Sequence, residues 1–319
     1  MSYQILQGNC LDLLKDLEEK SINTCITSPP YYGLRDYGVN NQFGREETID
    51  EFVNNLVKVF REVRRVLRDD GTVWLNLGDS YGGQRGKGFN THQDKGGNNR
   101  VQELQKKHGD LKVTTGLPLK SLLGIPWRVA LALQADGWIL RQDIIWHKPN
   151  PMPESVKDRC TKAHEYIFLL SKSKNYYYDN EAIKEPAKDW GTRDRTNGKY
   201  HNPGSGLAPH SGLTKSYSTK NKRSVWSVTV KPYKEAHFAT YPPDLIQPCI
   251  LAGSEEGDTI LDPFMGAGTT AAVAKSLGRY YLGCELNEDY GNLIQKRIQD
   301  YQPVKEVAQE PTINILDII

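Results

Sequence analysis

The segment Ser28-Pro29-Pro30-Tyr31 combines residue types that could hold an amine beside a flat ring. The Ser28 hydroxyl and the Pro29 carbonyl can both accept hydrogen bonds, and because proline has no N–H the turn presents mainly acceptors. Two such acceptors could hold the hydrogens of an exocyclic amine and direct its lone pair towards an electrophile. The Tyr31 ring offers a face on which an extruded base could stack. Taken alone, however, these four residues are better explained by a plain proline turn after a strand.

A second segment, LDPFMGAGTT at 261–270, predicts a strand end, a tight turn and the start of a helix. Gly266 and Gly268 let the backbone approach a ligand closely, and the helix N-terminus offers N–H groups to an anion. Glu285 ends the next expected strand 19 residues after Gly266, the spacing at which a carboxylate reaches ribose hydroxyls. The run is not G-x-G-x-x-G and lacks the lysine of a phosphate loop. It therefore favours a nucleoside without a phosphate chain, such as S-adenosylmethionine, over NAD or ATP.

Alternating strands and helices must position these two segments. Strands are expected at 3–7, 23–27, 72–77, 138–146, 164–171, 259–261 and 280–284, with a hairpin extension at 175–178. Helices are expected at 10–17, 48–68, 126–136, 242–252, 269–277 and 288–300. This alternation predicts an α/β fold with a doubly wound, mostly parallel sheet. The proline turn and the glycine turn each follow a strand, so they must be neighbours across this sheet if they act together.

The composition is that of a soluble globular protein, with 319 residues of which 38% are hydrophobic and 25% charged. No apolar run approaches the roughly 20 residues needed to cross a bilayer, and the first residues do not resemble a secretory signal. The cysteines are scattered and never form a C-x-x-C pair, which argues against a zinc site or a disulfide framework and for a reducing cytosol. They are Cys10, Cys25, Cys160, Cys249 and Cys284.

Positive charge is concentrated in one stretch of the chain. Residues 186–234 contain ten Lys or Arg and two Asp, a net charge of +8, which leaves −6 for the rest of the chain. A basic segment on an acidic body suggests a polyanion partner, and a solvated loop explains the charge equally well. A second polar stretch, 82–116, is also expected to be a loop.

Further polar residues lie at expected strand ends. His147 and Lys148 follow the strand at 138–146, where they could contact a phosphate or serve packing, and His164 and Glu165 are interpreted as structural. No cluster of His, Cys and acidic residues has metal-ligand spacing, and no nucleophile–base pair stands out. No metal site is therefore expected.

Together, TSPPYYGLRDYG at 27–38 and DPFMGAGTT at 262–270 resemble the motifs of the amino-DNA methyltransferases of bacteria and their phages. The order, with the catalytic motif N-terminal and the cofactor motif C-terminal, is similar to the β-type members of the N4-cytosine and N6-adenine DNA methylase family. The resemblance covers nearly the whole chain and implies the S-adenosylmethionine-dependent methyltransferase fold with an inserted target-recognition region. It implies a catalytic and cofactor-binding domain at 1–184 and 235–302, a recognition insert at 185–234 and a tail at 303–319.

The resemblance also implies roles for the matching residues. The catalytic turn would be formed by Ser28, Pro29, Pro30 and Tyr31. The methionine and ribose part of the cofactor would be lined by Asp262, Phe264, Gly266 and Gly268, with Glu285 on the ribose hydroxyls and Thr240 and Pro242 near the methionine end. Asn9 would lie near the adenine, where the family often has an acid, and it can hydrogen-bond adenine without adding charge. The candidate DNA-binding residues are Arg193, Arg195, Lys220, Lys222 and Arg223.

A serine rather than an aspartate at the head of the turn is more typical of the N4-cytosine enzymes in this family. The predicted function is therefore sequence-specific transfer of a methyl group from S-adenosylmethionine to N4 of a flipped-out cytosine in double-stranded DNA. N6-adenine methylation, an RNA or protein substrate, and a catalytically silent DNA-binding protein on the same fold are the alternatives. The expected setting is the cytoplasm, for a bacterial or phage protein with no membrane partner. A homodimer and a cognate restriction endonuclease stay open, and the endonuclease is not required physically.

Overall fold

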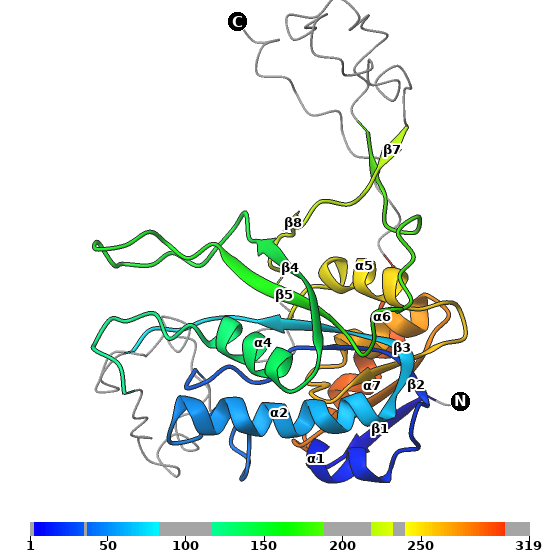
Figure 1. The fold of residues 1–319 in the computed structure, drawn as a ribbon, viewed down its shortest axis with the longest axis horizontal. Helices are drawn as coiled ribbons and strands as arrows, with labels where there is room; N and C mark the ends of the chain where they lie inside the picture. Colours follow the sequence, from blue (N-terminus) through cyan, green and yellow to red (C-terminus); the bar gives the residue numbers. More distant parts are fainter. Residues whose placement is uncertain (1–2, 35–36, 83–115, 188–217, 232–239, 304–319) are drawn as a thin grey trace, which may run out of the picture.

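An eight-stranded sheet forms the centre of the protein (Figure 1). The computed structural model describes residues 3–34, 37–82, 116–187, 218–231 and 240–303. The strands lie in the order β1 (Gln4–Gln7), β10 (Tyr280–Glu285), β9 (Thr259–Asp262), β2 (Ile22–Thr27), β3 (Leu67–Leu77), β5 (His164–Ser171), β4 (Ile139–His147) and β8 (Val225–Ser227). All neighbours from β1 to β3 are parallel, as are β4 and β8, and β5 runs antiparallel to both β3 and β4. The predicted mostly parallel sheet is confirmed.

Helices cover both faces of the sheet (Figure 1). One face carries α1 (Cys10–Leu13), the 3-10 turn η1 (Leu14–Asp16), α2 (Ile49–Val66) and α4 (Ile125–Ala135). The other face carries α5 (Pro243–Gly253), α6 (Thr269–Ser276) and α7 (Tyr290–Asp300). Side chains of β3 alternate between these layers, since Val73 and Leu75 pack with the first group and Trp74 packs with the second. The fold is therefore doubly wound, as the sequence predicts.

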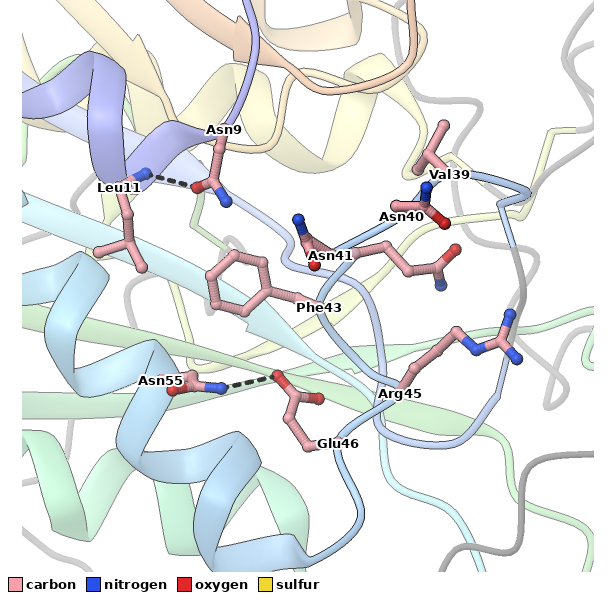
Figure 2. A pocket seen from close by; sticks show the side chains of 10 residues that line it. Asn9, Leu11, Val39, Asn40, Asn41, Phe43, Arg45, Glu46 and Asn55 are labelled. Atoms are coloured by element: carbon pink, nitrogen blue, oxygen red, sulfur yellow. Dashed lines mark hydrogen bonds between the residues drawn. The ribbon is translucent and has the colours of Figure 1, made fainter. Parts of the chain in front are cut away.

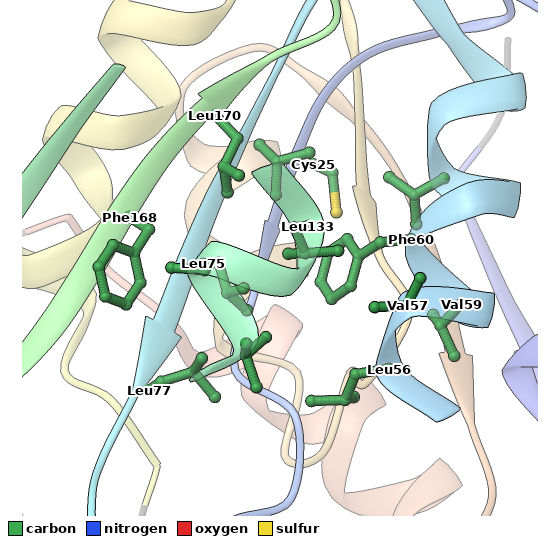
Figure 3. Packing of buried hydrophobic residues seen from close by; sticks show 14 of the residues in the cluster. Cys25, Leu56, Val57, Val59, Phe60, Leu75, Leu77, Leu133, Phe168 and Leu170 are labelled. Carbon is green, nitrogen blue, oxygen red and sulfur yellow. The ribbon is translucent and has the colours of Figure 1, made fainter. Parts of the chain in front are cut away.

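Helix α2 shows how sequence signals set the first layer. Thr48 is its N-cap, and the Thr48 Oγ1 atom accepts a hydrogen bond from the Glu51 backbone N–H at 3.1 Å. The apolar residues of its inner face are buried, and Figure 3 shows Leu56 and Phe60 of this helix close to Leu133 of α4. The expected helix at 48–68 is confirmed to within two residues at either end.

One expected strand is wrong. Residues 175–178 do not form a strand that extends β5 into a hairpin. They lie beside the first residues of β3 instead. The Tyr177 N–H donates to the Asp70 carbonyl at 2.9 Å, and the Tyr178 ring stacks on Trp74 with centroids 6.2 Å apart. The aromatic residues that suggested a strand therefore serve packing between layers. The expected helix at 10–17 is also divided between the short α1 and η1.

The strand directions gather several chain segments at one edge of the sheet. The parallel strands β2, β9 and β10 end there at Thr27, Asp262 and Glu285. Because β5 runs the opposite way, its first residues, from His164, reach the same edge beside the ends of β3 and β4. This edge therefore brings together residues from both halves of the chain.

The described parts of the region 185–234 form two structures. The short strands β6 (Glu185–Pro186) and β7 (Thr219–Lys220) pair with each other and project away from the main sheet (Figure 1). Strand β8 instead joins the main sheet beside β4. Among the described residues, no helix has the length and apolar character needed to span a membrane.

Candidate active site

The proline turn and the glycine turn are neighbours across two adjacent strands. Thr27, the last residue of β2, donates from its hydroxyl to the Asp262 carboxylate at the end of β9, with 2.6 Å between the oxygens. The rings of Phe43 and Phe264 also meet edge to face with centroids 5.3 Å apart. The segments that the sequence places far apart therefore share one edge of the sheet.

The Asp262 carboxylate is buried, and its two oxygens accept hydrogen bonds from several segments of the chain. One of its oxygens also accepts the Phe264 N–H at 3.0 Å, and the other accepts the hydroxyls of Thr270 and Tyr241. Burial raises the pKa of Asp262, and its hydrogen bonds, that from Thr27 first, act to lower it. Asp262 thus fixes the glycine turn, the end of β2 and the segment before α5 relative to one another. The sequence offered no spacing signal for Tyr241.

The residues before α5 lie close to α7. Pro242 is the N-cap residue of α5, and its carbonyl accepts the Leu245 N–H at 3.0 Å. The Thr240 hydroxyl lies 3.5 Å from the Arg297 guanidinium. Both predicted residues are therefore at the entrance of α5, next to the Tyr241 hydroxyl that reaches Asp262.

The glycine turn and Glu285 form a connected unit. Gly266 and Gly268 have φ values of 54° and 81°, in the region that favours glycine. A side chain at Gly268 would also lie 2.9 Å from Ile294. The Gly266 and Asn287 N–H groups donate to the two carboxylate oxygens of Glu285 at 2.7 and 2.8 Å. Burial raises the pKa of Glu285 to about 7, although these hydrogen bonds lower it.

A pocket of about 500 Å³ lies beside this unit (Figure 2). Asn9 lines it and follows Gly8, whose N–H donates to the Glu285 carbonyl at 2.8 Å. The Asn9 side-chain oxygen caps α1 by accepting the Leu11 N–H at 2.9 Å. Figure 2 shows the Phe43 ring lying between Asn9 and Glu46. The other lining residues, which the sequence did not single out, are Leu11, Val39, Asn40, Asn41, Gln42, Phe43, Arg45, Glu46 and Asn55.

Tyr31 is held by residues that sequence reasoning missed. Its ring lies against Gly78, where an added Cβ would be 2.4 Å from the ring atom Cε2. Its hydroxyl donates to the Glu165 carboxylate at 2.6 Å and lies 3.2 Å from the Asn76 side-chain oxygen. Burial, followed by the charge of Glu165, raises the pKa of Tyr31 well above its ordinary value, while a hydrogen bond with Ser28 lowers it. Tyr31 is therefore a protonated phenol.

The prolines of the turn differ in exposure, since Pro29 is buried and Pro30 is half-buried, like Ser28. The interpretation of Glu165 as structural did not anticipate its contact with Tyr31. No motif could have identified this contact, because the partners are 134 residues apart and meet only through the antiparallel course of β5.

The candidate DNA-binding residues are partly described. Arg193 and Arg195 lie outside the described residues. The other three surround the Glu185 carboxylate at the base of the β6–β7 pair, with N–O distances of 4.0 Å for Lys220, 3.8 Å for Lys222 and 3.0 Å for Arg223. In the described part of the chain, no group of three His, Cys, Asp or Glu residues has the geometry to hold a metal ion.

Comparison with known proteins gives a family match over most of the chain. The model of the N6/N4 methyltransferase family, described as DNA methylase, matches residues 22–296. The chain is 44% identical over 297 residues to the Type II methyltransferase M.SmaI of Serratia marcescens, covering 93% of this chain and 91% of that protein. It is 45% identical over 296 residues to the Type II methyltransferase M.XycI of Xanthomonas campestris pv. cyanopsidis, covering 92% and 87%.

Solved structures share the fold. The cytosine-N4-specific PvuII DNA methyltransferase aligns with a TM-score of 0.62 at 18% identity, covering 95% of this chain and 89% of that one. A putative DNA modification methylase from Thermus thermophilus, solved in complex with S-adenosyl-L-methionine, aligns with a TM-score of 0.56 at 22% identity and covers 93% of each chain.

Proposed function

Because the chain belongs to the N6/N4 DNA methylase family, we propose that it methylates the N4 amine of cytosine in double-stranded DNA with S-adenosylmethionine as the methyl donor. One observation carries the proposal. The hydrogen bond from Thr27 to Asp262 sets the turn that starts at Ser28, rich in acceptors, beside the glycine turn. Ser28 at the head of the turn supports cytosine as the target base. The Type II relatives support a modification enzyme that recognises a DNA sequence.

The residues around the glycine turn fit S-adenosylmethionine. A Cβ added to Gly266 would meet no atom nearer than 3.9 Å, so the space beside the turn is open. Helix α6 begins after Gly268 without a side-chain cap, and its first N–H groups suit the methionine carboxylate. The Glu285 carboxylate suits the ribose hydroxyls, and the pocket at Asn9 and Phe43 suits the adenine ring. When bound, the cofactor supplies an electrophilic methyl group on a sulfonium.

The proline turn prepares the amine for attack. The Ser28 hydroxyl and the Pro29 carbonyl accept the two amine hydrogens, which favours a tetrahedral nitrogen and frees its lone pair. The Tyr31 ring stacks on the flipped base. With the cofactor bound, the amine nitrogen would take the methyl group, sulfur would keep the electron pair of the broken carbon–sulfur bond as a neutral thioether, and the amine would release one proton to solvent. None of these steps requires a metal or a covalent enzyme intermediate.

In this proposal, residues 1–184 and 235–302 form the catalytic domain and residues 185–234 recognise DNA. Phosphate contacts from the basic residues supply affinity, and other side chains read base edges. The enzyme acts on DNA in the cytoplasm.

The test is to incubate the protein with methyl-labelled cofactor and mixed-sequence duplex DNA, then digest the DNA to nucleosides. We expect N4-methylcytosine from the native protein and none from Ser28→Ala. Detection of N6-methyladenine would instead identify adenine as the target base. Label only in 5-methylcytosine, or cofactor binding without any methylated base, would reject the proposed function.

A further inference from the structure

The Tyr31 hydroxyl lies at the centre of a polar network that crosses several strands. Asn76 comes from β3, Glu165 from β5 and Lys148 from the residue after β4. One Glu165 oxygen accepts the Tyr31 hydroxyl at 2.6 Å and the Asn76 side-chain amide at 3.3 Å. The other Glu165 oxygen forms an ion pair with the Lys148 ammonium. Side chains of β3 and β5 therefore converge on one phenol, and Lys148 holds the Glu165 carboxylate.

The network is partly buried. The Lys148 and Glu165 side chains are only 19% and 15% exposed. The Lys148 ammonium also lies 4.3 Å from the centre of the Trp146 ring, a cation–π contact that fixes its position. A charged pair at this depth requires geometry that satisfies both partners, because desolvation is costly. Here the Lys148 ammonium contacts Glu165 and the Trp146 ring, and the Glu165 carboxylate also accepts from Tyr31 and Asn76.

The direction of the hydrogen bonds is also set. The Asn76 amide N–H donates to the Tyr166 carbonyl at 3.1 Å as well as to Glu165. The Tyr31 hydroxyl has a single proton, and its shortest contact is with the Glu165 carboxylate. Burial raises the pKa of Tyr31, which favours the protonated phenol as the donor. A hydrogen bond from a phenol to a carboxylate is of the stronger kind.

The Glu165 contact acts on the outer end of the Tyr31 ring, where the hydroxyl also lies 3.2 Å from the Asn76 side-chain oxygen and hydrogen-bonds with Ser28. Tyr31 follows a proline turn and precedes Gly33, whose φ is 66°. The ring fits against Gly78 because that residue has no side chain. The bond to Glu165 is the shortest that the hydroxyl makes, so it restrains the orientation of the ring most directly.

We propose that Glu165 is a positioning residue, which holds the Tyr31 ring in the orientation that receives the flipped base, with Lys148 as the counterion that fixes its carboxylate. The inference rests on the proposed function, in which that ring stacks on the base. It gives a role to a glutamate that no motif assigned. Glu165 acts through Tyr31 and does not itself touch the reacting atoms.

The test is a double-mutant cycle of Tyr31→Phe and Glu165→Ala, with kcat and the KM for the cofactor measured on duplex DNA. We expect each single variant to lower kcat about tenfold, the value of one charge-assisted hydrogen bond, with KM for the cofactor unchanged. The double variant should be no slower than either single variant, because both remove the same contact. Glu165→Gln should recover most of kcat, since its amide oxygen can still accept the phenol. Losses that multiply in the double variant would overturn the inference.

A second readout does not depend on methyl transfer. A 3-fluorotyrosine placed at residue 31 should shift its fluorine resonance in Glu165→Ala and return towards the native position in Glu165→Gln. The control is Glu62→Ala, which removes a partly exposed ion pair with Arg65 on α2 and should leave both the resonance and kcat unchanged. An unmoved resonance in Glu165→Ala would overturn the inference even if the enzyme methylates DNA. If the resonance moves but the native protein methylates no base, the proposed function fails, and the positioning role with it.

Discussion

The ring of Tyr31 lies against the backbone of Gly78, one residue after β3 ends. The φ of Gly78 is not in the left-handed region, so the backbone there would accept any residue. What excludes a side chain is the ring, since a Cβ would be 2.4 Å from Cε2. Glycine is therefore required at position 78 because the Tyr31 ring leaves no room for a Cβ, and not because of its φ.

We expect Gly78→Ala to displace the Tyr31 ring and to lower kcat by about 100-fold, the loss that a misplacement of about 1 Å can cause. The thermal midpoint should fall as well, because moving the ring breaks the hydrogen bond from the Tyr31 hydroxyl to Glu165. Steady-state kinetics and a melting curve on the same preparation measure both quantities.

The matched control is Gly291→Ala in α7, where an added Cβ meets no atom within 4 Å. That variant should retain full activity. Equal activity in the Gly78 variant would show that the ring position does not matter for catalysis.

Cofactor affinity should depend on pH through Glu285, whose pKa is about 7. The ionised carboxylate accepts ribose hydroxyls and the protonated form accepts them poorly. Affinity is therefore complete above the pKa and is lost as pH falls through it. At pH 6 about one tenth of the carboxyl is ionised, so the Kd for S-adenosylmethionine should rise about tenfold from its value at pH 8.

Isothermal calorimetry across this range measures the effect. Glu285→Gln should bind the cofactor weakly with no inflection near pH 7. A native protein whose Kd does not change between pH 8 and pH 6 would contradict the role of Glu285.

At the scale of elements, the antiparallel strand β5 is the least expected contributor to the site. Parallel strands bring only their carboxyl ends to the active edge, whereas β5 brings its first residues there. This reversal lets Glu165 reach Tyr31 beside Asn76 of β3. The strand thus completes the site from the opposite direction.

Helix α2 offers a stability test that leaves the site intact. Thr48→Ala removes the side-chain cap and should lower the free energy of unfolding by about 1 kcal/mol, while Thr48→Ser retains the cap. Urea unfolding of the three proteins measures the difference. The kcat of the folded protein should not change, and a fall in kcat would mean that α2 is coupled to the active edge.

Local sequence signals were sufficient for most of the fold. Thr48 and the apolar repeat after it predicted α2, and the glycine turn followed by Glu285 predicted the β9-α6-β10 unit. The strand expected at 175–178 failed because its aromatic residues pack on Trp74, a partner distant in sequence. The sequence did not predict the roles of Glu165 and Tyr241 for the same reason, since each depends on a contact with a residue distant in sequence.

At the scale of the whole molecule, charge is divided between a basic segment and an acidic body. Glu185 occupies the base of that segment and pairs with Lys220, Lys222 and Arg223. If residues 185–234 bind DNA, phosphates and Glu185 compete for the same cations. The carboxylate then limits how strongly the protein holds DNA of any sequence.

We expect Glu185→Gln to tighten binding to non-specific duplex DNA at low salt. The plot of log K against log salt should become steeper by up to about 0.9 for each additional phosphate that the freed cations neutralise. Fluorescence anisotropy over a range of salt concentrations measures the slope. As a control, Glu62→Gln removes one negative charge from α2 and should leave the slope unchanged. An unchanged slope in Glu185→Gln would show that Lys220, Lys222 and Arg223 do not contact DNA phosphates.

The buried carboxylate of Asp262 has a further consequence for how the protein fluctuates. It joins the end of β2, the glycine turn and the entrance of α5 through four hydrogen bonds, of which those from Thr27 and Thr270 are buried. Breaking one of these bonds in isolation would leave a buried polar group without its partner, so we expect them to open together. Amide protons on both sides of the junction should then exchange with solvent in one cooperative event, and the proline turn and the glycine turn should not open independently.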